Sequence, residues 1–194
     1  GVMLGVGVLI VVLAVMTGFT DEMKEKLLET TAHMQIFDFR NGCIRDTAEV
    51  MRKVEEAGCR GAPVVGRPGL LQKDKRLVPK EVIGIDPAHL DDGIQVSKYI
   101  SAGRFSLEKG KILVGDVTAH ELGLQVGDKI VIHSPEKIAQ MVKYDGKGKV
   151  DLASTSKVYL PDEYEISGTF LFGKYDFDSS IVFMNMDDAG ELFN

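Results

Sequence analysis

The first twenty residues of the chain carry no charged side chain. Residues 1–18 comprise thirteen apolar residues, four glycines and one threonine. As a helix rising about 1.5 Å per residue, this segment would reach roughly 27 Å, close to the hydrocarbon thickness of a bilayer. The sequence therefore favours a transmembrane helix over residues 1–20. Because the chain opens without an initiator methionine, we expect that helix to be truncated at its N-terminus.

Two other structures compete with a membrane span for this segment. A secretory signal peptide would need a basic residue ahead of a shorter apolar run and a small-residue cleavage site. The first basic residue is Lys24, and the run ends in Met16-Thr17-Gly18-Phe19. A buried core helix would usually be shorter and would show a polar face. The membrane span is the preferred interpretation of the three.

The helical pattern continues beyond the apolar run. Residues 21–31 are mostly polar and include many good helix formers, and Glu22 and Lys26 form an i,i+4 pair of opposite charge. We therefore expect a helical stalk at 21–31 that is continuous with the membrane helix. Such a rod could transmit motion between a bilayer and the rest of the chain.

Beyond the stalk, the sequence predicts an α+β domain. Runs rich in β-branched and aromatic residues alternate with short helical patterns that end at glycines. We expect strands at 33–39, 62–66, 80–85, 111–115, 129–133, 164–172 and 180–185, and helices at 46–57, 116–122 and 187–193. Asp187 is the expected N-cap of the last helix. The irregular segment 134–163 is too long for an ordinary connection.

Charge and composition narrow the function classes. The net charge is −6 at pH 7, and all charged residues lie beyond residue 20. No cluster of lysines and arginines is present that could neutralise phosphates, so nucleic acid is not expected as a partner. The acidic pairs Asp91-Asp92, Asp162-Glu163 and Asp187-Asp188 are expected on solvated surfaces.

Cysteine and histidine spacing argues against a metal site. Cys43 and Cys59 flank the predicted helix 46–57, which would separate its ends by about 18 Å. A disulfide needs Cα atoms within about 7 Å, so we expect two separate thiols. The four histidines are scattered, and no pair has the spacing of zinc ligands.

The sequence also lacks the usual motifs of catalysis. There is no Gly-x-Ser-x-Gly nucleophile motif, no His-Glu-x-x-His zinc motif and no phosphate-binding loop. We therefore predict no catalytic residue, no metal and no cofactor.

Four pieces of sequence, in this order, carry a family resemblance. They are Val12-Leu-Ala-Val-Met-Thr-Gly-Phe19, Val82-Ile-Gly-Ile-Asp-Pro87, the segment from Ile112 to Asp128, and Ile166-Ser-Gly-Thr-Phe-Leu-Phe-Gly-Lys-Tyr-Asp-Phe-Asp178 with Ala189-Gly-Glu-Leu192. Together they resemble the permease subunits of lipoprotein-releasing (Lol-type) ABC transporters and the wider MacB-like and FtsX-like permeases. The resemblance extends over the whole chain.

This resemblance implies a domain organisation. A first membrane helix would precede a periplasmic domain with an α/β "porter" part, here 32–87 and 164–194, and an inserted β-rich "sabre" part, here 88–133. Residues 134–163 lie where one Lol subtype has a hairpin that grips a periplasmic carrier protein. Their sequence differs from the pattern of that hairpin, and Lys143, Tyr144 and Lys147 are the candidate partner-binding residues in this loop.

The resemblance also implies a function. The chain would belong to an inner-membrane transporter that extracts lipoproteins, with ATP hydrolysed by a separate cytoplasmic subunit and with a second permease subunit. Met16, Phe19 and Met23, at i, i+3 and i+7, would face the lipid or lipoprotein chains, although ordinary helix packing explains the same spacing. The alternatives are an FtsX-like permease that controls a cell-wall hydrolase, and a MacB-like efflux permease.

Overall fold

The computed structural model describes residues 1–30, 34–38, 42–141, 143–144, 150–151 and 162–193. The chain forms two compact units, residues 1–45 and residues 46–194, and each is considered by itself.

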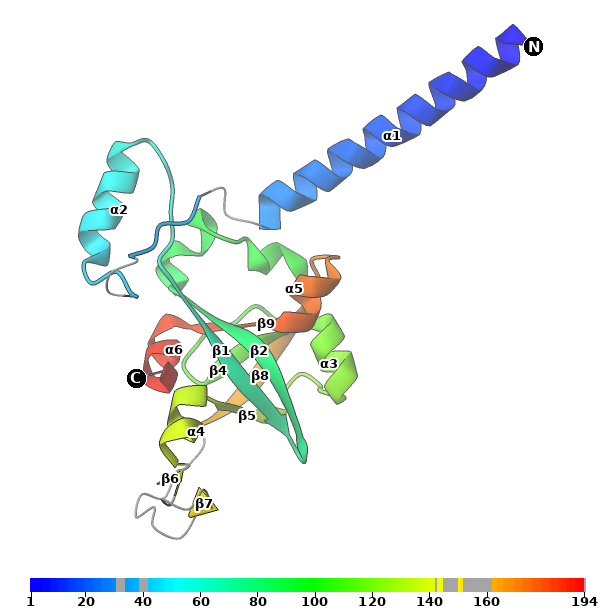
Figure 1. Ribbon diagram of the computed structural model, residues 1–194. Coiled ribbons are helices and arrows are strands. Elements are labelled where there is room, and N and C mark those ends of the chain that lie inside the picture. Colours follow the sequence, from blue (N-terminus) through cyan, green and yellow to red (C-terminus); the bar gives the residue numbers. More distant parts are fainter. Residues whose placement is uncertain (31–33, 39–41, 142, 145–149, 152–161, 194) are drawn as a thin grey trace. The chain divides into compact units, whose positions relative to one another are not determined.

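The first unit consists mainly of one long helix. α1 runs without interruption through Val2–Thr30, 29 residues, and contains both the predicted membrane segment and the predicted stalk as far as Thr30 (Figure 1). Residues 34–38 belong to no helix or strand. The strand predicted at 33–39 is therefore wrong over its described part. The sheets among the described residues are built from other segments, and an extended segment outside a sheet is not stable as a strand in water.

The second unit begins with an amphipathic helix. α2 covers Thr47–Glu56, and the Asp46 carboxylate accepts a hydrogen bond from the Glu49 N–H at 2.9 Å. Gly58 follows with φ +73°, which is the left-handed conformation expected just beyond a helix. The helix predicted at 46–57 is confirmed.

A long hairpin follows α2. β1 (Val64–Lys73) and β2 (Arg76–Ile85) pair antiparallel over their whole length, from Val64 opposite Ile85 to Lys73 opposite Arg76. Asp74, in the turn, adopts φ +54°, a conformation that aspartate tolerates better than most residues. Both strands are longer than predicted, because cross-strand pairing extends them through polar residues.

The remaining elements alternate between short helices and strands. They are η1 (Pro87–Asp92), η2 (Val96–Tyr99), β3 (Ile100–Gly103), β4 (Lys111–Gly115), α3 (Asp116–Leu122), β5 (Lys129–His133), α4 (Pro135–Met141), β6 (Lys143–Tyr144), β7 (Val150–Asp151), β8 (Asp162–Phe170), α5 (Tyr175–Ser180), β9 (Ile181–Asn185) and α6 (Met186–Phe193). The predictions for β4, α3, β5, β8, β9 and α6 are confirmed to within two residues at each end. The turn predicted near Gly173 is only partly right, because it leads directly into α5.

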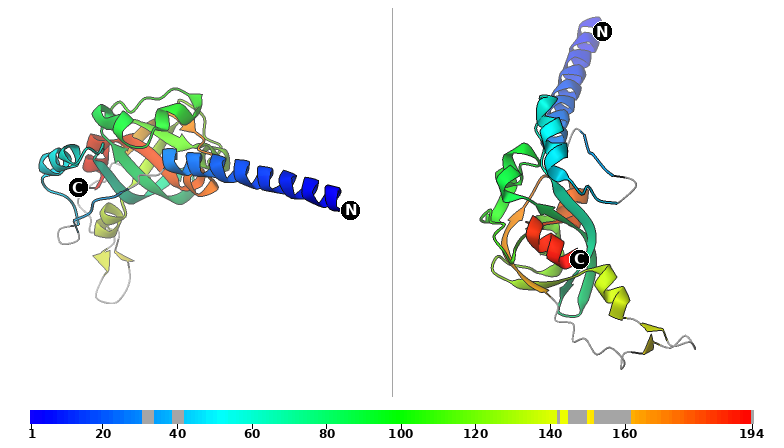
Figure 2. Two further views of the ribbon diagram at one scale, coloured as in Figure 1. Left: turned by 90° about the horizontal axis from the view of Figure 1, so that it is seen from above. Right: turned by 90° about the vertical axis from the view of Figure 1, so that its left-hand side faces the viewer.

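Seven strands form one sheet that closes on itself. Their order is β3-β8-β4-β9-β2-β1-β5, and β5 also pairs with β8. β8 makes this closure possible because one of its edges pairs with β4, whereas the other pairs with β5 near Glu165 and with β3 near Gly168. Six strands therefore form a ring, and the strands curve around α6 in the right-hand view of Figure 2.

The core follows the two-residue period of the strands. In β4, Ile112 and Val114 join one apolar cluster, whereas Leu113 between them joins another. β9 divides its residues in the same way. The first cluster also contains residues of α3 and α6, and the second contains the aromatic rings of Phe170, Phe172 and Phe183. Both faces of the sheet are thus covered, so β4 and β9 are almost entirely buried.

The strand pairings can be compared with the predicted division of the domain into a porter part and an inserted sabre part. β4 and β5 lie within the predicted insertion 88–133, yet they pair with strands on both sides of it in the sequence. Among the described residues, that segment has no separate sheet of its own. The porter and sabre boundaries stay a prediction.

One helix cap differs from its prediction. The side-chain oxygen of Asn185 accepts a hydrogen bond from the Asp187 N–H at 2.9 Å, so Asn185, not Asp187, caps α6. Asp187 lies inside the first turn, where its charge favours the helix through the dipole.

Candidate functional site

The surface of α1 is the first candidate site. Residues Val2–Lys24 form a helix long and apolar enough to cross a membrane, and no part of it is buried within the structure. The hydroxyl of Thr17 donates to the Leu13 carbonyl, and that of Thr20 to the Met16 carbonyl, each at 2.8 Å. These bonds satisfy both hydroxyls inside the helix, as a hydrocarbon environment requires.

Three large, soft side chains gather on one side of α1. Met16, Phe19 and Met23 are 62%, 63% and 51% exposed. At 100° per residue, they fall within about 60° of one another around the helix axis. The structure places them on one side of a helix that is exposed all round from residue 1 to residue 24.

The predicted partner-binding loop is described only in part. Lys143 and Tyr144 form β6, which pairs with β7 so that Lys143 lies opposite Asp151 and Tyr144 opposite Val150. Lys147 lies outside the described residues. A small antiparallel hairpin backbone is thus present in the segment 134–163.

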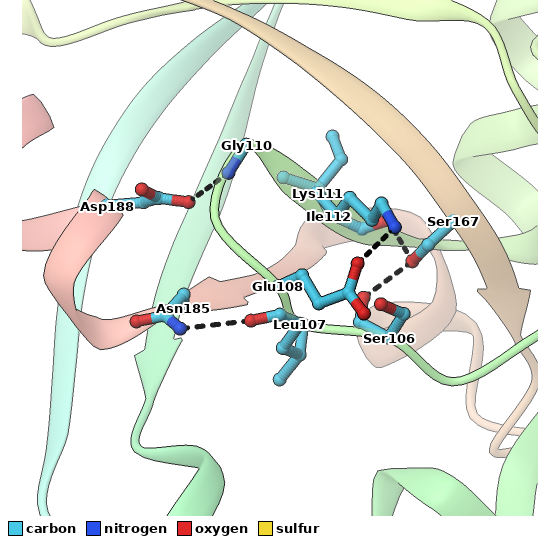
Figure 3. A network of polar contacts seen from close by, with 9 residues as sticks. All are labelled: Ser106, Leu107, Glu108, Gly110, Lys111, Ile112, Ser167, Asn185 and Asp188. Atoms are coloured by element: carbon cyan, nitrogen blue, oxygen red, sulfur yellow. Dashed lines mark hydrogen bonds and ion pairs between the residues drawn. The ribbon is translucent and has the colours of Figure 1, made fainter.

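A polar network fixes the loop before β4. The Asp188 carboxylate accepts a hydrogen bond from the Gly110 N–H at 2.7 Å, and the Asn185 amide donates to the Leu107 carbonyl at 3.0 Å (Figure 3). Ser167 donates to the carbonyls of Ser106 at 2.7 Å and Ile112 at 3.0 Å. These bonds join β8, β9 and α6 to the loop, so the network has a structural role.

Asp188 corrects one expectation. The pair Asp187-Asp188 was expected to be solvated, but Asp188 is only 3% exposed and is held by the Gly110 N–H. Helical periodicity explains the difference, because adjacent residues on a helix point in different directions. Asp162 and Glu163 are exposed, as predicted. The side chains of Asp91 and Asp92 lie outside the described set.

Charged pairs next to this network shift several pKa values. A hydrogen bond from Lys111 lowers the pKa of Glu108 (Figure 3), and the Glu191 carboxylate raises the pKa of Lys109. Across the domain, Lys73 donates to Asp128 at 3.1 Å and lowers the pKa of that carboxyl. All of these shifts favour the charged forms, so they indicate surface ion pairs and not acid–base catalysis.

A second buried carboxylate organises the turn after β8. Asp178 is 1% exposed, and its two oxygens accept hydrogen bonds from the N–H groups of Phe172 at 2.8 Å and Gly173 at 3.0 Å. The backbone of Asp178 lies so close to Gly115 that a Cβ there would be 2.1 Å from its carbonyl oxygen. The sequence shows Gly173 and Asp178 five residues apart, but only the folded structure shows that the Asp178 carboxylate accepts a hydrogen bond from the Gly173 N–H.

The described part of the chain offers little that resembles a catalytic pocket. Two shallow hollows are open to solvent, about 340 Å³ beside Arg104 and Lys111 and about 620 Å³ beside the hairpin turn at Asp74. No group of three or more His, Cys, Asp or Glu among the described residues is placed to hold a metal ion. Cys43 and Cys59 are exposed free thiols, as expected.

The described part of the chain combines a helix of membrane-spanning length and composition with an α+β domain. The sequence profile of the MacB-like periplasmic core domain matches residues 1–193. The chain therefore belongs to the family of MacB-like periplasmic core domain proteins.

Curated relatives are similar along the same length. The lipoprotein-releasing system transmembrane protein LolC of Neisseria meningitidis serogroup B is 28% identical over 198 residues, which are 100% of this chain and 44% of that protein. LolC of Xylella fastidiosa strain 9a5c is 29% identical over 199 residues, which are 99% of this chain and 44% of that protein. LolE of Haemophilus influenzae is 27% identical over 140 residues, which cover 68% of this chain and 33% of that protein. The chain spans less than half the length of these relatives.

A solved structure was also matched. The extracellular domain of the noncanonic ABC-type transporter YknZ from Gram-positive bacteria superposes with a TM-score of 0.44 at 11% sequence identity, covering 72% of this chain and 62% of that one.

Proposed function

We propose that this chain is the first membrane helix and extracytoplasmic domain of a Lol-type ABC permease that extracts lipoproteins from the inner membrane. One observation carries the proposal: α1 is a single helix from Val2 to Thr30. At about 1.5 Å per residue it is roughly 43 Å long, which exceeds the ~30 Å of bilayer hydrocarbon. A span of this length projects beyond the lipid without a break.

The continuity of α1 gives the proposed mechanism its physical basis. Sharp bends in helices occur at prolines, at pairs of glycine and serine, at bulges or at inserted groups, and the sequence of α1 contains no proline and no serine. Motion of the membrane part is therefore passed to the stalk. In this proposal ATP hydrolysis occurs on a separate cytoplasmic subunit, and the domain moves in response.

The face of α1 that carries Met16, Phe19 and Met23 is the proposed contact for lipid or lipoprotein acyl chains. Methionine is flexible and polarisable, so it adapts to chains of varied shape. All three side chains are exposed in the structure, which leaves them free to meet a ligand or a second permease subunit.

The proposed partners follow from the relatives named LolC and LolE. We propose an ATPase subunit, a second permease subunit, a lipoprotein cargo and a periplasmic carrier, with the porter and sabre parts as predicted. The β6–β7 hairpin, with Lys143, Tyr144 and Lys147 in its segment, is the proposed contact for the carrier.

Photo-crosslinking in the intact transporter tests the proposal. A photoreactive residue at Phe19 should capture an acylated lipoprotein several-fold more efficiently than one at Ala14. Ala14 is the matched control because it lies in the same apolar stretch but roughly 140° away around the helix. Equal capture at both positions would contradict the assigned face.

The same experiment at Tyr144 separates the alternatives. Capture of a lipoprotein carrier supports lipoprotein release. Capture of a cell-wall hydrolase, with no lipoprotein at Phe19, would instead support an FtsX-like signalling permease. Capture of neither, together with export of a soluble substrate, would support a MacB-like efflux permease.

A further inference from the structure

The turn between β8 and α5 projects apolar side chains into solvent. Among the described residues of the second unit, five large apolar side chains are exposed: Val64, Leu77, Val126, Leu171 and Tyr175. Two of the five, Leu171 and Tyr175, flank this one turn. Tyr175 is 67% exposed, the largest value of the five, and Leu171 is 46% exposed.

The backbone of this turn is held in place from inside the domain. Both oxygens of the buried Asp178 bind its N–H groups, at Phe172 and Gly173. The Leu171 N–H donates to the Tyr99 carbonyl at 2.8 Å. A turn that is already ordered loses little entropy on binding, so its projecting side chains suit a contact surface.

The interior side of the turn is anchored by aromatic packing. Phe172, between the two exposed residues, is 2% exposed, and its ring centroid lies 5.0 Å from that of Tyr99 and 5.1 Å from that of Phe170. Buried and projecting side chains therefore alternate along the turn. The exposure of Leu171 does not result from a loose segment.

We propose that the Leu171–Tyr175 turn contacts the surface of the bilayer in which α1 is embedded. Leucine adds apolar area, and tyrosine is enriched where lipid headgroups meet hydrocarbon. Lys174 lies between them, with its ammonium 5.2 Å from the centre of the Phe177 ring. Apolar, aromatic and cationic groups together are typical of segments that lie at a membrane interface.

The connection within the chain favours a lipid surface over other occupants. α1 ends at Thr30, and the second unit begins at Asp46. The fifteen residues 31–45 reach at most about 50 Å when fully extended. A surface tethered at this distance is always present at high effective concentration, so weak apolar contacts suffice. The inference rests on the membrane insertion of α1 that the proposed function requires.

The absence of tryptophan from the sequence allows a direct test. A Tyr175→Trp variant of the full chain would carry one tryptophan at the turn. The chain would be placed in nanodiscs of phosphatidylethanolamine and phosphatidylglycerol, with and without bromine on the acyl chains. Leu77→Trp, on β2 and 50% exposed, is the matched control, and Phe19→Trp in α1 reports membrane insertion.

The expected result is specific quenching at the turn. Interfacial groups lie roughly 5–10 Å into the headgroup and acyl boundary, so bromine should reduce Tyr175→Trp fluorescence about two-fold and leave Leu77→Trp unchanged. In addition, Leu171→Ser introduced beside Tyr175→Trp should weaken the quenching.

Four results would overturn the inference. Quenching of Phe19→Trp without quenching of Tyr175→Trp would refute the lipid contact and leave the proposed function intact. Equal quenching of Tyr175→Trp and Leu77→Trp would show that the turn is not specific. If Phe19→Trp is not quenched, α1 is not inserted, and both proposals fail. Finally, the Tyr175→Trp fluorescence could change only when a permease subunit is added, and not with brominated lipid. This result would assign the turn to a protein partner.

Discussion

Asp178 and Asp188 are buried carboxylates whose oxygens accept hydrogen bonds from backbone N–H groups of turns. Buried aspartates often indicate catalysis or metal binding, and sequence alone gives no way to separate these roles. Here the partners are backbone N–H groups of Gly110, Phe172 and Gly173. The two residues therefore fix loop geometry, and they differ from exposed neighbours such as Asp176 only through the fold.

Removal of the Asp178 carboxylate should destabilise the domain. Asp178→Ala leaves two N–H groups without their charged acceptor, and we expect a loss of about 2–3 kcal/mol in the free energy of unfolding. Asp178→Asn keeps one acceptor oxygen, so its loss should be smaller. Urea denaturation followed by circular dichroism measures both.

The matched control for this prediction is Asp176→Ala. Asp176 is exposed in the same short helix, so its replacement should change stability by less than about 0.5 kcal/mol. Equal losses for Asp176→Ala and Asp178→Ala would contradict the assigned role.

His133 gives the domain a pH dependence near neutrality. Burial lowers the pKa of His133, and its Nε2 lies 2.6 Å from the Gln72 side-chain oxygen. The folded pKa is below the unfolded value of about 6.5, so the unfolded chain binds the proton more tightly. The contribution of His133 to the free energy of unfolding is therefore complete above about pH 6.5. It is lost as the pH falls toward the pKa of His133 in the folded domain.

We therefore expect the urea concentration at the midpoint of unfolding to decrease as the pH is lowered from about 7 to about 5.5. In His133→Gln, this dependence of the midpoint on pH should be weaker. Asp128 also has a lowered pKa, because Lys73 donates to it, but its contribution is lost only below its unfolded pKa of about 3.9. An unchanged slope in His133→Gln would show that another group titrates in this range.

At the scale of elements, the sequence predicted local structure better than pairing. α2 was predictable because the capping residue Asp46, an apolar face and a terminal glycine lie close together in the chain. α3 has no side-chain cap, but its apolar residues are followed directly by Gly123. The long hairpin was predicted only in part, because residues 67–73 and 76–79 become strand through cross-strand pairing. The strand predicted at 33–39 is not formed over residues 34–38, and α5 is too short to show a helical period.

The candidate site was predictable to a different degree. The apolar segment and the exposed face of Met16, Phe19 and Met23 follow from composition and helical spacing alone. The Leu171–Tyr175 turn does not, because its definition depends on which side chains the closed sheet leaves outside. Closure of the ring by β5 and β8 joins residues thirty or more positions apart, and no local pattern encodes that pairing.

Replacing each of two glycines by alanine should change the stability of the domain in opposite directions. A Cβ at Gly115 would lie 2.1 Å from the Asp178 carbonyl oxygen, between β4 and α5. We expect Gly115→Ala to cost about 3 kcal/mol or more, because backbone cannot move aside easily.

Gly190 provides the contrast. It lies within α6, and a Cβ there would meet nothing within 4 Å. Gly190→Ala should stabilise the domain by up to about 1 kcal/mol, because alanine favours the helix. Thermal unfolding of both variants checks the pair, and a stable Gly115→Ala protein would show that β4 and α5 are less tightly packed.

At the scale of the whole molecule, both apolar core clusters of the described residues lie in the second unit. Both core clusters contain only residues beyond Asp46. We expect residues 46–194, produced without α1, to fold and to unfold in one cooperative transition in urea. Dispersed amide resonances would accompany this. Strong binding of a dye for exposed apolar surface, without a cooperative transition, would mean that the first unit is needed for folding.

The register of three neighbouring strands determines how this domain responds to force. Val64 at the start of β1 and Asn185 at the end of β9 both lie beside Ile85 of β2. With strands about 4.8 Å apart, the two points are roughly 10 Å from each other at one end of the sheet. Tension that draws both points in the same direction moves the domain as a rigid body. Tension that separates them peels the strands apart one residue pair at a time, so the domain is mechanically strong in the first case and weak in the second.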